Sequence, residues 1–191
     1  MSKGRLEAFS DAVIAIIITI MVLELRPPAG ASIPDLLPLS PTFFSYVLSF
    51  GLLGTYWNNH HHMLQVARTV DGRVLWANLH LLFWLSLFPF GTAWMGGTSF
   101  GPAPVAAYGA LLLASAIAYY VLVRALIATP GQAPTLASAI GNDVKGKISP
   151  LLFMVGIPIA LVAPAISLAI YGAVVVMWIV PDRRIERAIR D

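Results

Sequence analysis

The chain is 191 residues long, carries a formal net charge of +3, and combines 58% hydrophobic with only 11% charged residues. This charge density is about half that of a soluble globular domain, so the composition indicates a membrane protein. The basic residues stand at the ends of apolar blocks rather than on one polar face, which argues against a nucleic-acid partner. The chain has no cysteine, which excludes disulfides, thiolate metal sites and cysteine nucleophiles.

Apolar blocks separated by short polar segments follow one another along the chain. The first is closed by Arg26, Pro27 and Pro28, because consecutive prolines remove amide donors and clash with the preceding turn. The last is broken by Pro158 and Pro164 and has the length of two short helices. Since a span needs roughly 20 apolar residues, we expect six spans, at about residues 6–25, 41–66, 74–94, 104–127, 148–163 and 165–180.

The sequence therefore predicts an all-α, polytopic membrane protein with six transmembrane helices. We expect residues 1–191 to form a single transmembrane domain without a separate soluble part.

Lysine and arginine indicate how the spans are oriented. With six crossings and both termini in the cytoplasm, Arg26 is the only one of the 12 basic residues expected outside. If the last block crossed once instead of twice, four arginines would also lie outside: Arg183, Arg184, Arg187 and Arg190. The charge bias therefore favours six crossings over five.

The first span carries charged side chains near its start. Glu7 and Asp11 interrupt the basic N-terminus, and no clear cleavage motif follows, so we expect this segment to be retained as a helix. A charge within a bilayer costs a few kcal/mol unless it is paired or hydrated. A network of Arg5 and Asp11 through Ser10 would neutralise it. The alternative is that these residues lie among the headgroups and only anchor the helix.

A regular seam runs along the first span. Phe9, Ala12, Ile16, Thr19 and Leu23 follow spacings of three and four, which is typical of packed parallel helices. Such a seam can line a central axis. In a helix that is apolar all round, a seam more commonly marks buried packing. The periodicity leaves both interpretations open.

Three consecutive histidines, His60 to His62, stand near the end of the second span. Neighbours on a helix point about 100° apart and cannot converge on one ion, so we expect no metal site. We favour one histidine joining the polar cluster of the first span, together with Asn78 or His80 of the third span. The sequence does not say which histidine does so, and we take His61 and Asn78 as the candidates.

Arg5, Phe9, Ser10 and Asp11 match a known signature. The pattern R-x-x-x-F-S-D opens the first helix of the transmembrane protein 175 family, potassium channels of endolysosomes with prokaryotic relatives. The later run Ile16, Thr19, Ile20 and Leu23 also resembles that helix, and a looser similarity continues through Trp57, the histidines, Asn78 and Pro89-Phe90. The signature occurs once. The chain therefore resembles the prokaryotic form, in which four single-repeat chains build one pore, and not the two-repeat animal form.

The resemblance implies that the first helix lines the pore and that rings of isoleucine or leucine form its constriction. These positions fall on Ile16, Thr19, Ile20 and Leu23. An isoleucine ring offers an ion nothing to replace its hydration shell, so a narrow ring closes by dewetting. Thr19 can offer an oxygen to a partly dehydrated cation, or it can bond to a carbonyl one turn back. We expect a supporting polar network formed by Arg5, Phe9, Ser10, Asp11, His61 and Asn78.

The expected function is a potassium-permeable cation channel, formed by a homotetramer in a prokaryotic plasma membrane. Its partners are the lipid bilayer and monovalent cations, with no cofactor and no nucleic acid. The alternative is a proton-permeable channel or a proton-coupled transporter with a relay of Asp11, His61 and Glu24. Against a transporter, Asp11 and Glu24 lie toward opposite ends of their helix and no convincing internal repeat is seen. We expect no enzyme, because no H-E-x-x-H, G-x-S-x-G or comparable catalytic set occurs.

Overall fold

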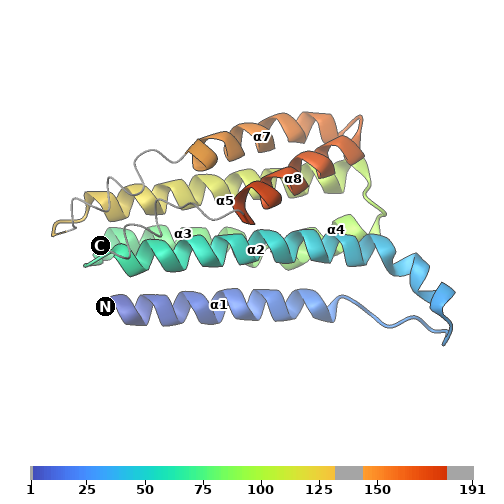
Figure 1. The fold of residues 1–191 in the computed structure, drawn as a ribbon, viewed down its shortest axis with the longest axis horizontal. Helices are drawn as coiled ribbons and strands as arrows, with labels where there is room; N and C mark the ends of the chain where they lie inside the picture. The colour runs from blue at the N-terminus through green and yellow to red at the C-terminus, as the bar shows by residue number, and fades with distance from the viewer. Residues whose placement is uncertain (1, 132–143, 180–191) are drawn as a thin grey trace.

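The computed structural model describes residues 2–131 and 144–179, and this part of the chain folds into a bundle of helices (Figure 1). The prediction of an all-α fold is confirmed. The helices are α1 (Lys3–Leu23), the 3-10 helix η1 (Ile33–Leu39), α2 (Ser40–Val66), α3 (Gly72–Ser86), α4 (Phe88–Gly97), α5 (Pro102–Ala128), α7 (Val144–Ala160) and α8 (Pro164–Ile179).

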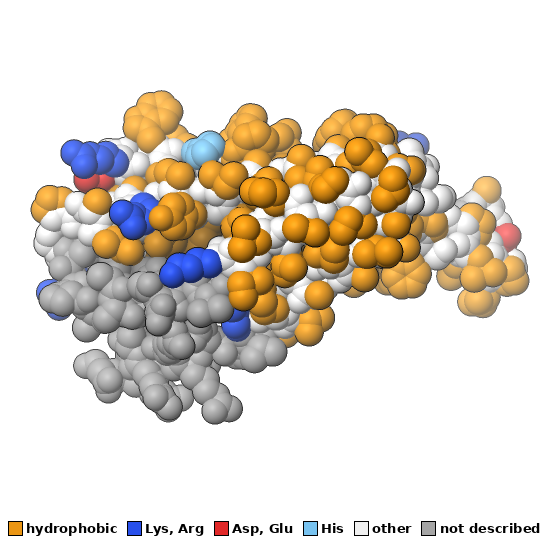
Figure 2. Space-filling model, turned by 90° about the horizontal axis from the view of Figure 1, so that it is seen from above, with side chains coloured by type: hydrophobic (Ala, Val, Ile, Leu, Met, Phe, Trp, Pro, Cys, Tyr) orange, Lys and Arg blue, Asp and Glu red, His pale blue; other side chains and the backbone are white. Residues whose placement is uncertain are grey.

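Four segments in the described ranges are long and apolar enough to cross a bilayer. They are Lys3–Leu23, Ile33–Val66, Gly72–Gly97 and Pro102–Ala128. The helix Pro164–Ile179 is apolar but shorter. Figure 2 shows hydrophobic side chains over most of one face, with Lys and Arg gathered mainly toward the end where α1 begins. Apolar flanks with basic ends are the pattern of an integral membrane protein.

The third apolar block is divided into two helices. The span expected over residues 74–94 lies within Gly72–Gly97, one candidate membrane span that is built from two helices, α3 and α4, with Leu87 between them. Pro89 lies in the first turn of α4, where its missing amide hydrogen leaves no bond unmade. The hydrogen bond from Gly91 N to Leu87 O then continues the helical pattern. The proline therefore sets where the chain breaks.

The helices are arranged so that α1 lies along one side of the bundle (Figure 1). It packs on α2, α3 and α4. Beyond these, α5 packs on α3 and α7, and α8 packs on α7, α5 and α2. The interfaces between the helices are filled by fully buried side chains, among them Leu53, Leu81, Leu85, Phe88 and Leu112.

Glycines allow the helices of the second half to approach closely. A Cβ atom at Gly109 of α5 or at Gly156 of α7 would collide with the ring of Tyr171 from α8. Lipid tails are as apolar as leucine, so helix association in a membrane depends on close packing of this kind. Tyr171 is fully buried between the two glycines.

The start of α1 is tied to the end of α2. Lys3 Nζ donates hydrogen bonds to the carbonyl oxygens of Gln65 and Ala67, at 3.4 and 3.0 Å. Gln65 lies in the last turn of α2 and Ala67 is its C-cap residue, and this end of a helix attracts a cation through the helix dipole. The two helices are therefore level at this end of the bundle.

Candidate functional site

Helix α1 has one buried and one uncovered face. Its buried positions are four or three residues apart and face the bundle: Leu6, Ser10, Ile14, Ile17 and Met21. The opposite face is not covered by any other helix that the structure describes. This face is therefore open to a second molecule or to lipid, as are the outward faces of the other helices.

All four positions predicted to line a pore lie on the uncovered face. Ile16 is 57% exposed, Ile20 43% and Leu23 75%, and Thr19 is exposed beside them. The next residue after Ile16 faces the other way, because Ile17 is only 3% exposed. Consecutive residues of an α-helix point about 100° apart, so Ile16 and Ile17 lie on different faces of α1.

Thr19 is the only hydroxyl in this stretch of α1. Its Oγ1 donates to the carbonyl oxygens of Ala15 and Ile16, at 3.1 and 2.8 Å. The hydroxyl hydrogen is thus engaged by the preceding turn, as is usual for threonine in membrane helices. The oxygen itself stays on the exposed face, where its lone pairs can accept a hydrogen bond or contact a cation.

A chain of buried hydrogen bonds fixes the covered face of α1. Ser10 Oγ donates to the carbonyl of Leu6 at 2.8 Å, and Asn78 Nδ2 of α3 donates to Ser10 Oγ at 2.9 Å. Asn78 Oδ1 accepts from His60 Nε2 of α2 at 2.7 Å. Ser10 and Asn78 are fully buried and His60 is 2% exposed. One amide therefore joins three helices in a place where an unpaired polar group would be costly.

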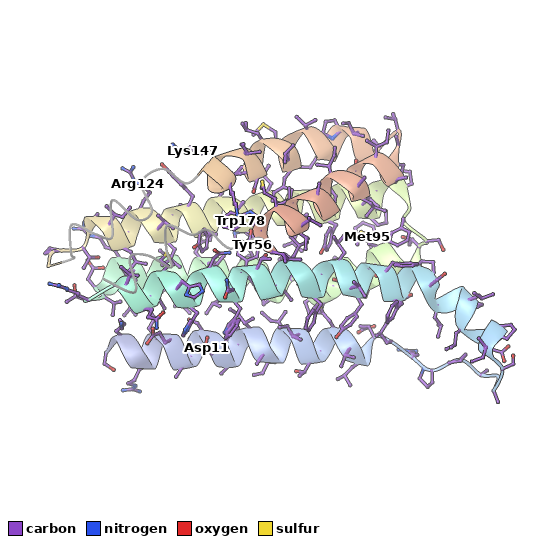
Figure 3. The ribbon with its side chains drawn as sticks, viewed as in Figure 1. Asp11, Tyr56, Met95, Arg124, Lys147 and Trp178 are labelled. Atoms are coloured by element: carbon purple, nitrogen blue, oxygen red, sulfur yellow. The ribbon has the colours of Figure 1, made fainter. Side chains whose placement is uncertain are left out.

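The histidine that joins Asn78 is His60 rather than His61. His61 lies about 100° further round α2 and stacks on Trp57, with ring centroids 5.8 Å apart and an interplanar angle of 19°. Trp57 Nε1 donates to Asp11 Oδ1 at 2.9 Å. His61 thus supports the contact of Trp57 with Asp11 from outside the buried chain. Figure 3 shows Asp11 on α1, the helix that runs alongside α2.

Arg5 and Phe9 lie away from this network. Both are exposed, and within the described ranges no ion pair joins Arg5 to Asp11. The two residues are six positions apart, which turns their side chains about 120° from each other on the helix. Phe9 lies on the uncovered face instead, in line with Ile16. Of the six residues expected in the network, Ser10 and Asn78 form one buried chain, and Asp11 and His61 form a separate contact through Trp57.

A second buried network escaped the sequence analysis. Ser49 Oγ of α2 lies 2.6 Å from Thr92 Oγ1 of α4 and 2.6 Å from Tyr108 Oη of α5. Thr92 Oγ1 also donates to Met21 Sδ of α1, at 3.7 Å. The sequence feature that could have predicted this network is the presence of hydroxyl side chains in otherwise apolar spans, because such groups form hydrogen bonds with neighbouring helices. The contact with Met21 Sδ links this network to the second half of α1.

A small cavity lies on the other side of α2. It has a volume of about 50 Å³ and is lined by side chains of α2, α5, α7 and α8, including Tyr56, Tyr119, Ser149 and Trp178. Figure 3 shows Tyr56 and Trp178 between α2 and α8, remote from α1. This space holds a few water molecules at most. It does not adjoin the uncovered face of α1.

Chemical groups for metal binding are not assembled in the described ranges. No group of three or more His, Cys, Asp or Glu side chains there is placed to hold a metal ion. What α1 presents on its uncovered face is a row of bulky apolar side chains with one hydroxyl oxygen among them. Such a row suits the wall of a pore or a contact between copies.

Comparison with known proteins identifies the family. The family model described as endosomal/lysosomal potassium channel TMEM175 matches residues 5–89, a range that contains the R-x-x-x-F-S-D signature. A potassium channel of Chryseobacterium sp. (strain P1-3) is 49% identical over 191 residues, covering 100% of both chains. A potassium channel of Chamaesiphon minutus (strain ATCC 27169 / PCC 6605) is 35% identical over 125 residues, or 61% of this chain and 62% of that one.

The fold agrees with a solved structure. The crystal structure of a lysosomal potassium-selective channel TMEM175 homolog from Chamaesiphon minutus superposes with a TM-score of 0.81. It is 25% identical, and the match covers 93% of this chain and 96% of that one. The resemblance noted in the sequence is thereby confirmed. The chain belongs to the TMEM175 family of potassium channels, a family of ion channels and not of enzymes.

Proposed function

We propose that this protein is a potassium-permeable cation channel, in which four copies place α1 around a central pore in a prokaryotic plasma membrane. The observation that carries the proposal is the uncovered face of α1, which holds Ile16, Thr19, Ile20 and Leu23 together. Family membership supports it, because three relatives that match over 61% or more of this chain are named potassium channels.

The constriction is formed by rings of Ile16, Ile20 and Leu23. From Ile16 to Leu23 the helix rises about 10 Å, so three apolar rings make a short narrow segment. Apolar rings close a narrow pore by excluding water, and widening them lets hydrated ions pass. Thr19 adds a ring of hydroxyl oxygens within this segment, which favours cations over anions.

Assembly is required for conduction in this proposal. One copy contributes one α1, and the covered face of that helix is already occupied by its own α2, α3 and α4. A central pore therefore needs the uncovered faces of several copies to meet. The prokaryotic form that the sequence resembles suggests four.

The buried hydrogen bonds act as supports in this proposal and do not bind the ion. Asp11 and Ile16 are five residues apart, or about 140° around the helix. If Ile16 faces the pore, Asp11 faces the bundle, in keeping with its contact to Trp57. The Ser10–Asn78–His60 chain fixes the rotation of α1, which decides which side chains face the axis.

The proposed orientation has both termini in the cytoplasm and six crossings. The basic residues support it, since Arg26 is then the only one outside. Four arginines of the C-terminus lie outside the described residues, so this part of the argument rests on sequence.

A proton-coupled transporter is the second candidate, with Asp11 and Glu24 as relay groups. It is disfavoured because these two carboxylates lie toward opposite ends of α1.

A flux assay on purified protein separates the two candidates. Proteoliposomes loaded with potassium and prepared at equal internal and external pH should release it through a channel when a protonophore lets protons enter and balance the charge. Native mass spectrometry of the same preparation should show a tetramer. Potassium release at the same rate with and without the protonophore would favour an electroneutral proton-coupled transporter. A monomer that still conducts would contradict the assembly.

A further inference from the structure

Arg5 lies on the stripe of α1 that holds the proposed pore-lining residues. Each residue of an α-helix is turned by about 100° from the one before, so Arg5 lies within about 20° of Ile16 and in line with Leu23. The side chain of Arg5 is exposed, and Phe9 between Arg5 and Ile16 is exposed on the same face. The uncovered face of α1 therefore carries a guanidinium group at the end where the helix begins.

The other charged side chains near the start of α1 lie off this stripe. Lys3 is bonded to the end of α2, and Asp11 accepts a hydrogen bond from Trp57. Glu7 is half-buried and lies about 160° round the helix from Arg5. Within residues 2–131 and 144–179, no ion pair or side-chain hydrogen bond engages Arg5. Its charge is therefore unpaired in the described part of one copy.

Arg5 lies at the mouth of the proposed pore and not in its constriction. It is eleven residues from Ile16, which corresponds to a helix rise of about 16 Å. Salt screens charges over about 10 Å at 0.1 M ionic strength. The charge of Arg5 therefore acts on ions that enter the mouth and is largely screened at the isoleucine ring.

The opposite end of the bundle carries charge of the other sign. Among the described residues its charged side chains are Glu24, Arg26 and Asp35, which are two carboxylates and one guanidinium, a net charge of −1 per copy. Glu24 is exposed at the C-cap of α1. Figure 1 shows the connections from α4 to α5 and from α7 to α8 at the same end, and neither contains a charged residue. The two ends of α1 are therefore electrostatically unlike.

We infer that the Arg5 side chains of the four copies form a cationic ring at the pore mouth where α1 begins, and that this ring limits the entry of cations from that side. The inference rests on the proposed tetrameric channel. A positive mouth lowers the local concentration of potassium, and a negative mouth raises it. Potassium current that enters at the Arg5 mouth is therefore smaller than the current that the same voltage drives in the opposite direction.

A single cysteine tests the ring, because the natural sequence contains none. Arg5→Cys channels are recorded in planar bilayers with about 0.1 M KCl on both sides. They are treated from one side at a time with membrane-impermeant methanethiosulfonate reagents that attach either a sulfonate or a trimethylammonium group. The side from which the reagent changes the current identifies the Arg5 mouth in each bilayer.

The sulfonate should raise the potassium current that enters at this mouth at least about twofold above that of the trimethylammonium adduct. In about 1 M KCl, where charges are screened within about 3 Å, the difference should vanish. The reversal potential between potassium and sodium should not move, because both ions carry the same charge. Equal currents from the two adducts, with labelling verified by mass spectrometry, would overturn the inference.

Arg124→Cys is the matched control at the same end of the bundle. Arg124 is exposed on α5, and Figure 3 shows it across the bundle from α1. Its two adducts should give equal currents, since the charge lies away from the proposed axis. A difference as large as that at Arg5→Cys would show that any charge on this surface acts on the current, and the ring would be refuted.

Unlabelled channels give a second reading that does not depend on the cysteine variant. The wild-type channel and Arg5→Lys should rectify in about 0.1 M KCl and lose the rectification in about 1 M KCl, whereas Arg5→Gln should rectify less at both concentrations. A wild-type channel with equal currents in both directions at the lower concentration would overturn the inference while the proposed function stands. A wild-type protein that passes no current would refute the proposed function and the ring together.

Discussion

Asn78 is the residue on which the contact of three helices depends. Its two amide atoms serve different partners, since Nδ2 donates to Ser10 and Oδ1 accepts from His60. A side chain of similar volume without polar atoms would leave the buried imidazole N–H without an acceptor. In a membrane the unfolded chain also finds hydrogen-bond partners, which lowers the free-energy cost of losing these two hydrogen bonds. The loss is still destabilising.

Asn78→Leu should therefore destabilise the protein by about 1 kcal/mol. The measurement is the melting temperature of purified protein in detergent. Ser86→Ala is the matched control on the same helix, because Ser86 is exposed and bonds only to the carbonyl of Phe83. Equal melting temperatures for the two variants would show that the buried chain contributes nothing to stability.

Ile16 and Ile17 offer a direct comparison of the two faces of α1. Ile16→Asn puts hydrogen-bonding groups into a dry constriction, so unitary conductance should rise and selectivity should fall. Ile17→Asn places the same amide in the packed face, where Ile17 is 3% exposed, and should reduce the amount of functional protein. Recording of single channels separates conductance from protein yield. A rise in unitary conductance confined to Ile17→Asn would show that the pore-facing side of α1 has been assigned wrongly.

At this scale the sequence predicted some positions and not others. The spacing of Ile16, Thr19, Ile20 and Leu23 identified a common face, because α-helical geometry alone decides which residues share one. The choice between His60 and His61 could not be made, since both stand on α2 and only the rotation of that helix against α3 distinguishes them. That rotation is set by tertiary packing.

At the scale of helices, the contact of α5, α7 and α8 depends on two glycines. A Cβ atom at Gly109 would meet Tyr171 Oη and lie 2.8 Å from Tyr171 Cζ. Tyr171 Oη has no hydrogen-bond partner among the described residues, so the hydroxyl is held there by packing alone.

Gly109→Ala should destabilise the protein by about 1–3 kcal/mol through overpacking. Gly172→Ala on α8 is the control, because a Cβ atom there meets nothing within 4 Å. Adding Tyr171→Phe to Gly109→Ala removes the colliding oxygen and should recover part of the lost melting temperature. If the double variant melts no higher than Gly109→Ala, the hydroxyl is not the source of the strain.

The positions of the helices were largely predicted by the apolar blocks and the short polar segments between them. Pro27 and Pro28 follow the end of α1 at Leu23 by a few residues, as expected of helix breakers. The division of the third block at Leu87 was not expected, because Pro89 is tolerated both within a kinked membrane helix and at the start of a new one. The helix η1 lies between the first two expected spans and was not predicted, since a short 3-10 helix has no periodic signal of its own.

At the scale of the whole molecule, composition and one signature led to the right family. The residues Arg5, Phe9, Ser10 and Asp11 occupy a short part of α1, yet the fold agrees with the solved relative over 93% of the chain. How the helices pack around α1 could not be read from sequence, because every span is apolar on most sides. The number of copies around the pore stays a prediction, for it depends on a surface that one chain leaves uncovered.

The central claim is that copies of this chain form a pore that passes potassium. The most direct test is single-channel recording of purified protein in planar bilayers, with potassium on one side and sodium on the other at equal pH. We predict unitary current steps and a reversal potential displaced toward the potassium equilibrium potential. Absence of unitary steps from a verified tetramer, or current that appears only with a proton gradient, would contradict it.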